Sequence, residues 1–204
     1  STTTVTAFSG DMIPCRAWRI SFRGLSRCPA DGGAKLAEQV LYVKTADLSE
    51  KQLDEICLLK MEAWPYPLDR QRSWIAQHNA ADDVHVLYYR NAELAAYLFS
   101  TRLALDLDGR SESALGIGNV IVKTGHRKTG LGIELLRRFQ SDVAGGAASL
   151  LLCKDTLVPF YQKGGWTLFP GETYCDSSLL TCACMYQNGT NFDKTARLTL
   201  DKLF

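Results

Sequence analysis

The spacing of apolar residues predicts two neighbouring helices early in the folded part of the chain. Helical spacing relates Leu53, Ile56, Cys57, Lys60 and Trp64. Just before them, Ser49 is followed three residues later by Gln52, which is the pattern of a capping box. We therefore expect a helix over 49–63, which two prolines end, and a second short helix over 68–79.

Most of the remaining pattern indicates strands. Runs of strand-forming residues predict strands at 39–45, 84–89, 93–105, 114–123, 149–153, 166–169 and 181–187. Two further helices are expected over 130–144, where Gly145 and Gly146 end the first, and over 157–163. This order of elements predicts an α/β fold with a mixed sheet and helices on both of its faces.

The charge balance argues against one broad class of function. The 204 residues carry 23 basic and 22 acidic side chains, a net charge of +1, which does not suit a protein that binds nucleic acid by neutralising phosphates. The 7 cysteines form no regular framework and the 3 histidines complete no zinc spacing, so neither a disulfide scaffold nor a metal site is expected. No apolar run approaches the ~20 residues of a membrane helix. We expect a cytoplasmic protein with no membrane partner.

The first 38 residues are expected to form an extension of a domain that spans 39–204. Turn-forming residues at 28–33 separate the two. Basic side chains recur in the extension at helical spacing, at Arg16, Arg19, Arg23 and Arg27. This spacing also suits an organelle transit peptide, but an element that packs on the domain is the interpretation we favour.

One loop carries the candidate chemistry. A strand that ends in Val120, Ile121 and Val122 runs into the loop, which opens a helix at Gly130. Successive backbone N–H groups in such a loop form a nest for an anion together with the helix N-terminus. Glycine at 130 and 132 lets the main chain approach a phosphate, and Arg127 and Lys128 add positive charge. The pattern lacks the Gly-Lys-Ser/Thr of a nucleotide-binding P-loop, and alone it equally suits a turn whose glycines merely relieve strain.

A second motif gives the loop its context. The sequence Arg-Lys-Thr-Gly-Leu-Gly at 127–132 is similar to the acetyl-CoA motif of the GNAT superfamily, Arg/Gln-x-x-Gly-x-Gly/Ala, which follows a Val-x-Val strand. About thirty residues later, Tyr161 to Trp166 resembles the second signature of that superfamily, Tyr-x-x-x-Gly-Phe/Trp. The resemblance covers 39–187, and aminoglycoside 2′-N-acetyltransferase-like proteins are the most similar in appearance.

The resemblance implies a fold and a donor site. Members have a central, mostly antiparallel sheet that splays between two parallel strands, here 120–122 and 149–153. Acetyl-CoA would be the acyl donor, bound by Val120, Ile121, Val122, Arg127, Lys128, Thr129, Gly130, Leu131 and Gly132. An amide near Ile121 would polarise the acetyl carbonyl. Tyr161 would protonate the departing thiolate, although a tyrosine at this position can also serve only to pack on the sheet.

The acceptor side resembles the family less closely. An amine would attack the thioester directly, yet Gly118 and Asn119 stand where an acid is expected and Lys154 stands where an asparagine is. Candidates for the missing base are Glu112, His85 and Tyr97. The acceptor is expected to contact 49–79 and 166–187, where aromatic side chains could form a wall at Trp64, Tyr66, Trp74 and Trp166.

Three functions are consistent with this pattern. The first is an N-acetyltransferase for a primary amine of a small molecule, with aminoglycoside-like amines included. The second is an acetyltransferase for a protein N-terminus or lysine. The third is an acetyl-CoA-binding module without catalysis. Acids in turns that could steer a cationic acceptor are Asp69, Asp82, Asp83, Asp106 and Asp108. Homodimerisation is left open.

Overall fold

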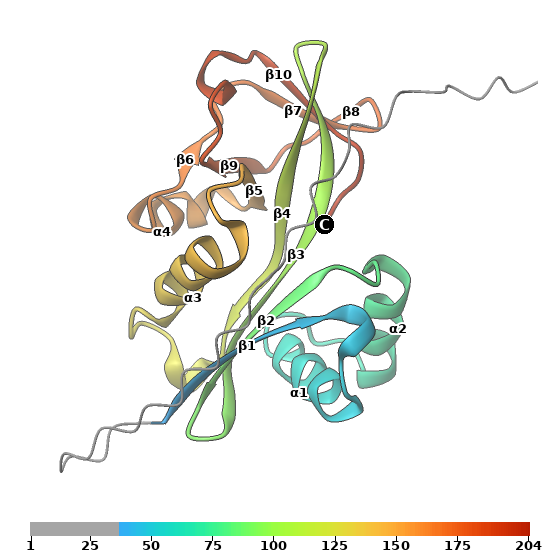
Figure 1. Cartoon of the computed structure of the whole chain (residues 1–204), viewed down its shortest axis with the longest axis vertical. Coiled ribbons are helices and arrows are strands. Elements are labelled where there is room, and N and C mark those ends of the chain that lie inside the picture. Colours follow the sequence, from blue (N-terminus) through green and yellow to red (C-terminus); the bar gives the residue numbers. More distant parts are fainter. Residues whose placement is uncertain (1–36) are drawn as a thin grey trace, which may run out of the picture. The chain divides into compact units, whose positions relative to one another are not determined.

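A computed structural model describes residues 37–204 as one mixed sheet with helices against both faces. Figure 1 shows α1 and α2 on one side of the long strands and α3 and α4 on the other. The principal helices are α1 (Glu50–Met61), α2 (Leu68–His78), α3 (Leu131–Phe139) and α4 (Val158–Lys163). The strands are β1 (Glu38–Lys44), β2 (Val84–Arg90), β3 (Glu93–Leu107), β4 (Arg110–Val122), β5 (Ser149–Cys153), β6 (Thr167–Leu168), β7 (Glu172–Cys175), β8 (Ser178–Leu179), β9 (Ala183–Gln187) and β10 (Arg197–Leu200). The predicted fold class is confirmed.

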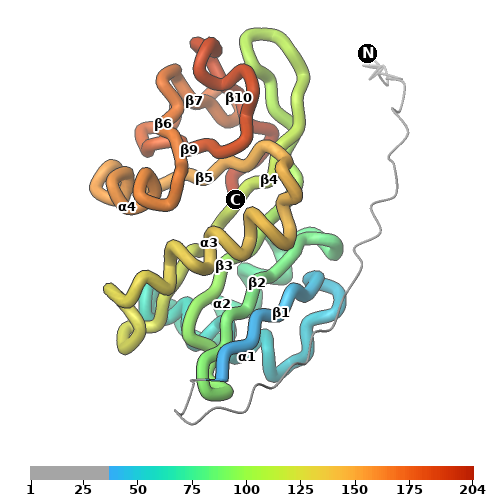
Figure 2. Tube along the Cα trace, turned by 60° about the vertical axis from the view of Figure 1, so that its left-hand side comes forward, coloured from blue at the N-terminus to red at the C-terminus, as the bar shows by residue number. Residues whose placement is uncertain are grey.

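The sheet is antiparallel except at two places. Its main path runs β6-β9-β5-β4-β3-β10-β7-β8, and β1 and β2 extend it from β3. The parallel pairs are β4 with β5 and β10 with β7. Strand β3 is long enough to pair with β2, β4 and β10, and it therefore joins the parts of the sheet. Figure 2 shows the strands that follow β5 gathered at one end of the domain.

Alternation along β3 explains why helices cover both faces. Ala96 and Leu98 point to one face, where they pack in the same buried cluster as Leu135 and Phe139 of α3. Tyr97 and Phe99 point to the other face and pack with α1 residues such as Ile56. Both faces of β3 are thus buried.

The predicted capping box is present at α1. The Ser49 side chain accepts a hydrogen bond from the backbone N–H of Gln52, and the Gln52 side chain accepts one from the backbone N–H of Ser49. The reciprocal bonds satisfy two donors that a helix otherwise leaves free, so α1 begins where the sequence predicts.

The helix expected over 130–144 ends as predicted, with a π-helical last turn over Gln140–Ala144 and a left-handed Gly145 after it. Two other features of the predicted fold are wrong. The strand expected at 166–169 is only two residues long. The prediction also misses β7, β8 and β10, because these strands are only two to four residues long.

The N-terminal division stays a prediction. The extension proposed for 1–38 and its four arginines lie, apart from the last two residues, outside the described part of the chain. Within the part that is described, no helix is both long and apolar enough to span a bilayer.

Candidate functional site

Strand β4 separates from β5 partway along its length. The two strands pair only where Leu115, Gly116 and Ile117 meet the first three residues of β5. Beyond Ile117, β4 keeps β3 as its sole neighbouring strand among residues 37–204. The last residues of β4, which include Val120, Ile121 and Val122, thus present a free backbone edge. Such an edge can hydrogen-bond an extended ligand as a further strand would.

A β-bulge lies at the point of separation. Gly118 pairs with Phe99 and Ile121 pairs with Tyr97, so Asn119 and Val120 stand opposite a single residue of β3. Asn119 has a φ of 52°, in the left-handed region. A bulge bends its strand and re-aims its side chains, which is how β4 turns away from β5.

The loop after β4 has the geometry of an anion nest. Lys128 and Gly130 both have left-handed backbones, with φ of 63° and 85°. Across the described residues, no backbone carbonyl accepts from the N–H groups of 128–132. Helix α3 also begins at Leu131 without a side-chain cap. These free donors fit the pyrophosphate of a coenzyme A thioester.

The two glycines of the loop serve different purposes. Gly130 is required by its positive φ, and a Cβ there would meet nothing within 4 Å. A Cβ at Gly132 would lie 2.9 Å from the Phe160 ring, so that glycine lets α3 pack closely against α4. The expectation that both glycines let the main chain approach a phosphate stays a prediction.

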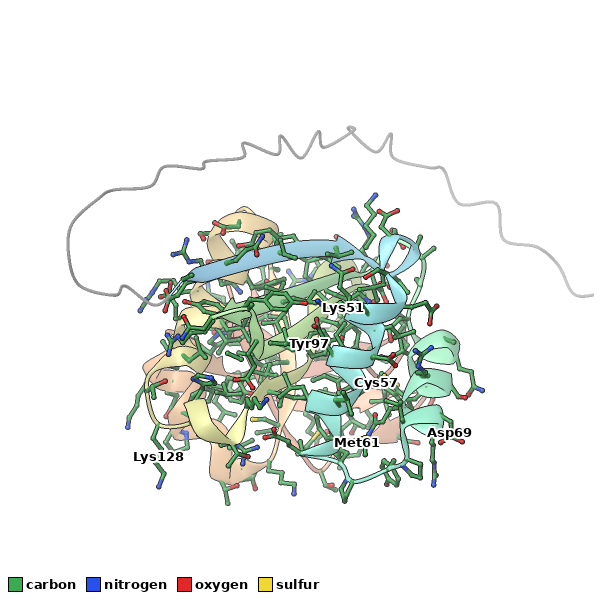
Figure 3. All side chains as sticks on the ribbon, turned by 90° about the horizontal axis from the view of Figure 1, so that it is seen from below. Lys51, Cys57, Met61, Asp69, Tyr97 and Lys128 are labelled. Atoms are coloured by element: carbon green, nitrogen blue, oxygen red, sulfur yellow. The ribbon has the colours of Figure 1, made fainter. Side chains whose placement is uncertain are left out.

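The side chains of Arg127 and Lys128 differ in their contacts with the rest of the protein. Arg127 donates from Nε to the carbonyl oxygen of Val122 at 2.9 Å and lies 3.8 Å from the Glu62 carboxylate, so it braces the loop. Thr129 closes the turn with a 2.7 Å bond to the His126 carbonyl. Lys128 has no carboxylate partner within 37–204, and Figure 3 shows its side chain extending away from the body of the molecule. Lys128 is thus the cation that is free to meet a phosphate.

Tyr161 is both a packing residue and a potential donor. It is 6% exposed and lies in one buried cluster with Cys153 and Trp166. Burial, with the nearby Cys153 thiol as a smaller cause, raises the pKa of Tyr161 to about 12. The phenol is consequently neutral at physiological pH and keeps a proton to donate. Its proximity to Cys153, the last residue of β5, places it beside the gap between β4 and β5.

The candidate bases do not lie at this gap. Glu112 is exposed near the start of β4, seven residues from Asn119, which is about 23 Å along a strand. His85 and Tyr97 are buried and hydrogen-bonded to each other at 2.8 Å, and the other nitrogen of His85 lies 3.0 Å from the Thr45 hydroxyl. Burial, together with the charge of Lys60, lowers the pKa of His85 to about 4. The structure gives the last two a packing role and leaves Glu112 distant.

Gly118, at the position of the expected acid, lies in a crowded part of the structure. A Cβ on Gly118 would lie 2.3 Å from the Phe99 ring and 3.1 Å from the backbone of Phe204. A carboxylate side chain cannot be accommodated there without displacing both. The Phe99 ring and the Phe204 backbone thus fill the space that a side chain at position 118 would need.

A pocket of about 400 Å³ opens beside the bulge. Its lining comes from the end of α1, the α1–α2 connection, α2 and β4, and comprises Lys60, Trp64, Tyr66, Arg70, Gln71, Trp74 and Asn119. Three of the four residues predicted as an aromatic wall thus share one pocket. The prediction is wrong for Trp166, which is 2% exposed in the cluster beneath α3 and α4. The segment 166–187 does not line this pocket, and its contact with an acceptor stays a prediction.

Sequence reasoning missed four lining residues. Lys60 had a signal, since it stands at helical spacing with apolar residues and is 3% exposed. Arg70 and Gln71 had none beyond their place in the expected acceptor segment 49–79, and Asn119 was noted only as standing where an acid is expected. The acids considered for steering are not in the lining: Asp83 accepts from Ala80 N–H, and Asp108 accepts from the N–H groups of Ala196 and Arg197. Over the described residues, no three potential metal ligands cluster.

Comparisons with known proteins agree with this geometry. A model of the family described as "Acetyltransferase (GNAT) domain" matches residues 44–169. The solved structure of ElaA from Escherichia coli is 20% identical, with a TM-score of 0.54 over 74% of this chain and 99% of that chain. The GNAT family N-acetyltransferase YhbS from Escherichia coli, solved in complex with CoA, is 12% identical, with a TM-score of 0.59 over 83% of this chain and 93% of that chain.

A third similar structure has a named acceptor class. It is an aminoglycoside 6′-N-acetyltransferase complexed with coenzyme A, 14% identical, with a TM-score of 0.54 over 72% of this chain and 96% of that chain. At these identities the likeness concerns the fold. None of the curated proteins is significantly similar to this chain in sequence.

Proposed function

The chain belongs to the GNAT acetyltransferase family and is by that membership an acetyl-CoA-dependent N-acetyltransferase, and we propose that its acceptor is a primary amine of a small molecule. One observation carries the proposal. The strand that separates from β5 runs directly into the loop with five free amides, so one continuous segment can hold both the arm and the pyrophosphate of the donor.

We assign the donor contacts as follows. The free amides of 128–132, with the Lys128 side chain, bind the pyrophosphate, while Arg127 braces the loop from Val122. The edge of β4 at 120–122 pairs with the extended arm of the donor. Acetyl-CoA supplies the acetyl group as an activated thioester. A backbone N–H near Ile121 donates to the thioester carbonyl oxygen and stabilises the negative charge that develops there.

The acceptor approaches from the pocket beside the bulge. Asn119 lines this pocket and belongs to β4, so an amine bound there faces the same strand as the donor. Holding both reactants at one strand supplies proximity. The amine nitrogen forms a bond to the acetyl carbon as the carbon–sulfur bond breaks, and the Tyr161 hydroxyl donates its proton to the departing sulfur. The ammonium loses one proton to water before it attacks and a second after it, because the pocket reaches solvent at Trp64 and Tyr66, and a proton from water then restores the Tyr161 hydroxyl.

The size of the pocket favours a small molecule as acceptor. About 400 Å³ lies within the range of small-ligand sites. Aminoglycoside-like amines and protein amines are the competing acceptor classes, and a module without catalysis is the competing function.

A thiol-release assay tests the proposed function. Acetyl-CoA is offered with a panel of amino acids, simple amines and aminoglycosides, and free coenzyme A is measured for the wild type and for Tyr161→Phe. We expect acceptor-dependent release in the wild type and slower release in the variant. Tight coenzyme A binding without release for any of these amines would sink the proposed small-molecule acceptor and leave protein amines or a binding module.

A further inference from the structure

The pocket beside the bulge has a charge pattern that acetyl transfer itself does not require. Two of its lining residues, Lys60 and Arg70, are cations, and none of its lining residues is an acid. An amine acceptor arrives as an ammonium ion, which two positive charges repel. Some other group of the acceptor must therefore compensate.

Lys60 is the more constrained of the two cations. Its side chain is 3% exposed, and its ammonium group lies 4.0 Å from the centre of the Trp74 ring. Among the described residues no carboxylate approaches within ion-pair distance of this ammonium. Buried charges in proteins are ordinarily paired, and a ring face compensates only part of the lost hydration. Lys60 is therefore a buried cation that lacks an anionic partner.

Arg70 is positioned at the outer part of the same pocket. Its guanidinium lies 4.5 Å from the centre of the Tyr66 ring and, within 37–204, forms no ion pair. The surrounding loop is fixed, because the Gln71 amide donates to the Trp64 carbonyl at 2.8 Å. Trp64 and Tyr66 nevertheless stay 40% and 48% exposed, so two aromatic faces remain uncovered at the mouth of the pocket.

The acids nearest in sequence are engaged elsewhere or outside the lining. Glu50 and Asp54 pair with Arg72, Glu55 accepts from Tyr89, and Glu62 accepts from Thr124. Asp69 is exposed and does not line the pocket. The positive charge of the pocket is thus left uncompensated by the protein, and a ligand is the remaining source of an anion.

We propose that Lys60 and Arg70 bind a carboxylate of the acceptor, so that the substrate is an amino acid or a closely related amine with a carboxylate, and not a polycationic amine. Trp64 and Tyr66 contact the apolar part of this substrate, and its amine lies toward Asn119 and β4. The inference rests on the proposed function for the reaction, but the binding of the carboxylate can be measured without turnover.

Matched acceptors test the proposal. Thiol release is measured with L-phenylalanine, L-phenylalaninamide, 2-phenylethylamine and kanamycin. The amide and the free acid differ only in the carboxylate, and the amine of the amide is the less protonated, which favours the amide on chemical grounds alone. We expect kcat/KM for L-phenylalanine to exceed that for the amide by about tenfold or more, as a charge-assisted contact provides. Equal or better use of the amide, the phenylethylamine or kanamycin would overturn the proposal.

Variants of Lys60 and Arg70 test whether these residues cause the preference for the carboxylate. Lys60→Met and Arg70→Gln should each lower the acid-to-amide ratio of kcat/KM, by about tenfold for Lys60→Met, and Lys60→Arg should restore it. Lys51→Met is the matched control, since Lys51 lies on α1 with a side chain that is 85% exposed, at the end of the helix away from Met61 (Figure 3). Arg70 is exposed, so Arg70→Gln keeps the test valid if Lys60→Met does not fold. A ratio unchanged in both variants would refute the assignment.

A binding measurement separates the two proposals. N-acetyl-L-phenylalanine and its neutral amide are titrated calorimetrically into the protein with coenzyme A present. If no amine is acetylated but the acid binds at least about tenfold more tightly than the amide, the proposed function fails while the carboxylate site stands. If amines are acetylated but the two ligands bind equally, the carboxylate site fails and the proposed function stands.

Discussion

Glu62 and Thr124 connect the acceptor side of the molecule to the donor loop. The Glu62 carboxylate accepts hydrogen bonds from the backbone N–H and the hydroxyl of Thr124, at 2.8 and 2.7 Å. Glu62 directly follows Met61, the last residue of α1, which Figure 3 labels at the end of that helix. Burial acts to raise the pKa of Glu62, but the bonds from Thr124 and the charge of Arg127 outweigh it and lower the pKa. The carboxylate is thus ionised and holds the two loops together.

We predict that Glu62→Ala weakens the binding of both acetyl-CoA and the acceptor. Without the carboxylate, the α1–α2 connection and the loop after β4 lose their shared contact, which at this partly exposed position is worth about 1 kcal/mol. The KM values for acetyl-CoA and for the acceptor should therefore each rise about fivefold, with a smaller change in kcat. Glu50→Ala, at the start of α1 and paired with Arg72, serves as the control. A change confined to one of the two substrates would show that Glu62 does not couple the loops.

Tyr161→Phe should slow the reaction without weakening the binding of the donor. The variant keeps the ring that packs with Cys153 and Trp166 and loses only the hydroxyl, so we expect kcat to fall by about 10²-fold or more while the Kd for coenzyme A stays the same. Steady-state kinetics beside calorimetry of coenzyme A binding measure the two quantities. Because the pKa of Tyr161 is about 12, the wild type should show no loss of activity from tyrosine ionisation near neutral pH. An unchanged kcat would leave Tyr161 with its packing role alone.

Lys60 should lower the stability of the fold at neutral pH. Burial lowers the pKa of Lys60 from 10.5 to about 8, with the neighbouring Cys57 acting in the opposite direction. His85, whose pKa Lys60 lowers, also lies nearby. Below about pH 8 the lysine is charged in both states, and burying that charge costs about 3 kcal/mol, part of which the Trp74 ring offsets. Lys60→Met should therefore raise the free energy of unfolding at about pH 7 by about 1 to 3 kcal/mol, while it impairs selection of the acceptor.

The pH dependence of this difference has a defined sign. Between about pH 8 and 10.5 the unfolded chain keeps a proton on Lys60 that the folded chain has lost, so the stability of the wild type rises with pH through this window. The advantage of Lys60→Met should shrink over the same window. Chemical denaturation of both proteins at about pH 7 and about pH 10 measures it. A Lys60→Met protein that is less stable at both values would contradict a net cost of the buried ammonium.

Local sequence signals predicted helix α1 well. The capping box at Ser49 and the apolar spacing of α1 depend on neighbours three and four residues apart, which the sequence displays directly. The separation of β4 from β5 followed from the resemblance carried by Gly130, Gly132 and Tyr161, and the structure contains it. The binding roles of these residues remain predictions.

Long-range packing decided what the sequence did not reveal. Strand β10 forms because β3 extends past β2 and offers that edge near Leu107, and the four residues of β10 are too few to predict a strand by themselves. Trp166 resembles the other tryptophans in the sequence, yet it is buried beneath α3 and α4. The sequence shows Lys60 among apolar positions of α1, but it does not show that Trp74 of α2 lies beside the ammonium group.

A titration with coenzyme A tests the central claim, that the nest at 128–132 binds the pyrophosphate. The wild type is compared by calorimetry with Gly130→Asp, and with Gly125→Asp, which adds the same charge to the same loop at a position with open space and an ordinary backbone. At Gly130 a side chain adds about 1 to 2 kcal/mol of backbone strain, and the carboxylate repels the phosphates from within the nest. We predict one-to-one binding by the wild type, little change in Gly125→Asp, and a Kd at least about tenfold higher in Gly130→Asp. Equal affinity in all three proteins would contradict the placement of the donor in this loop.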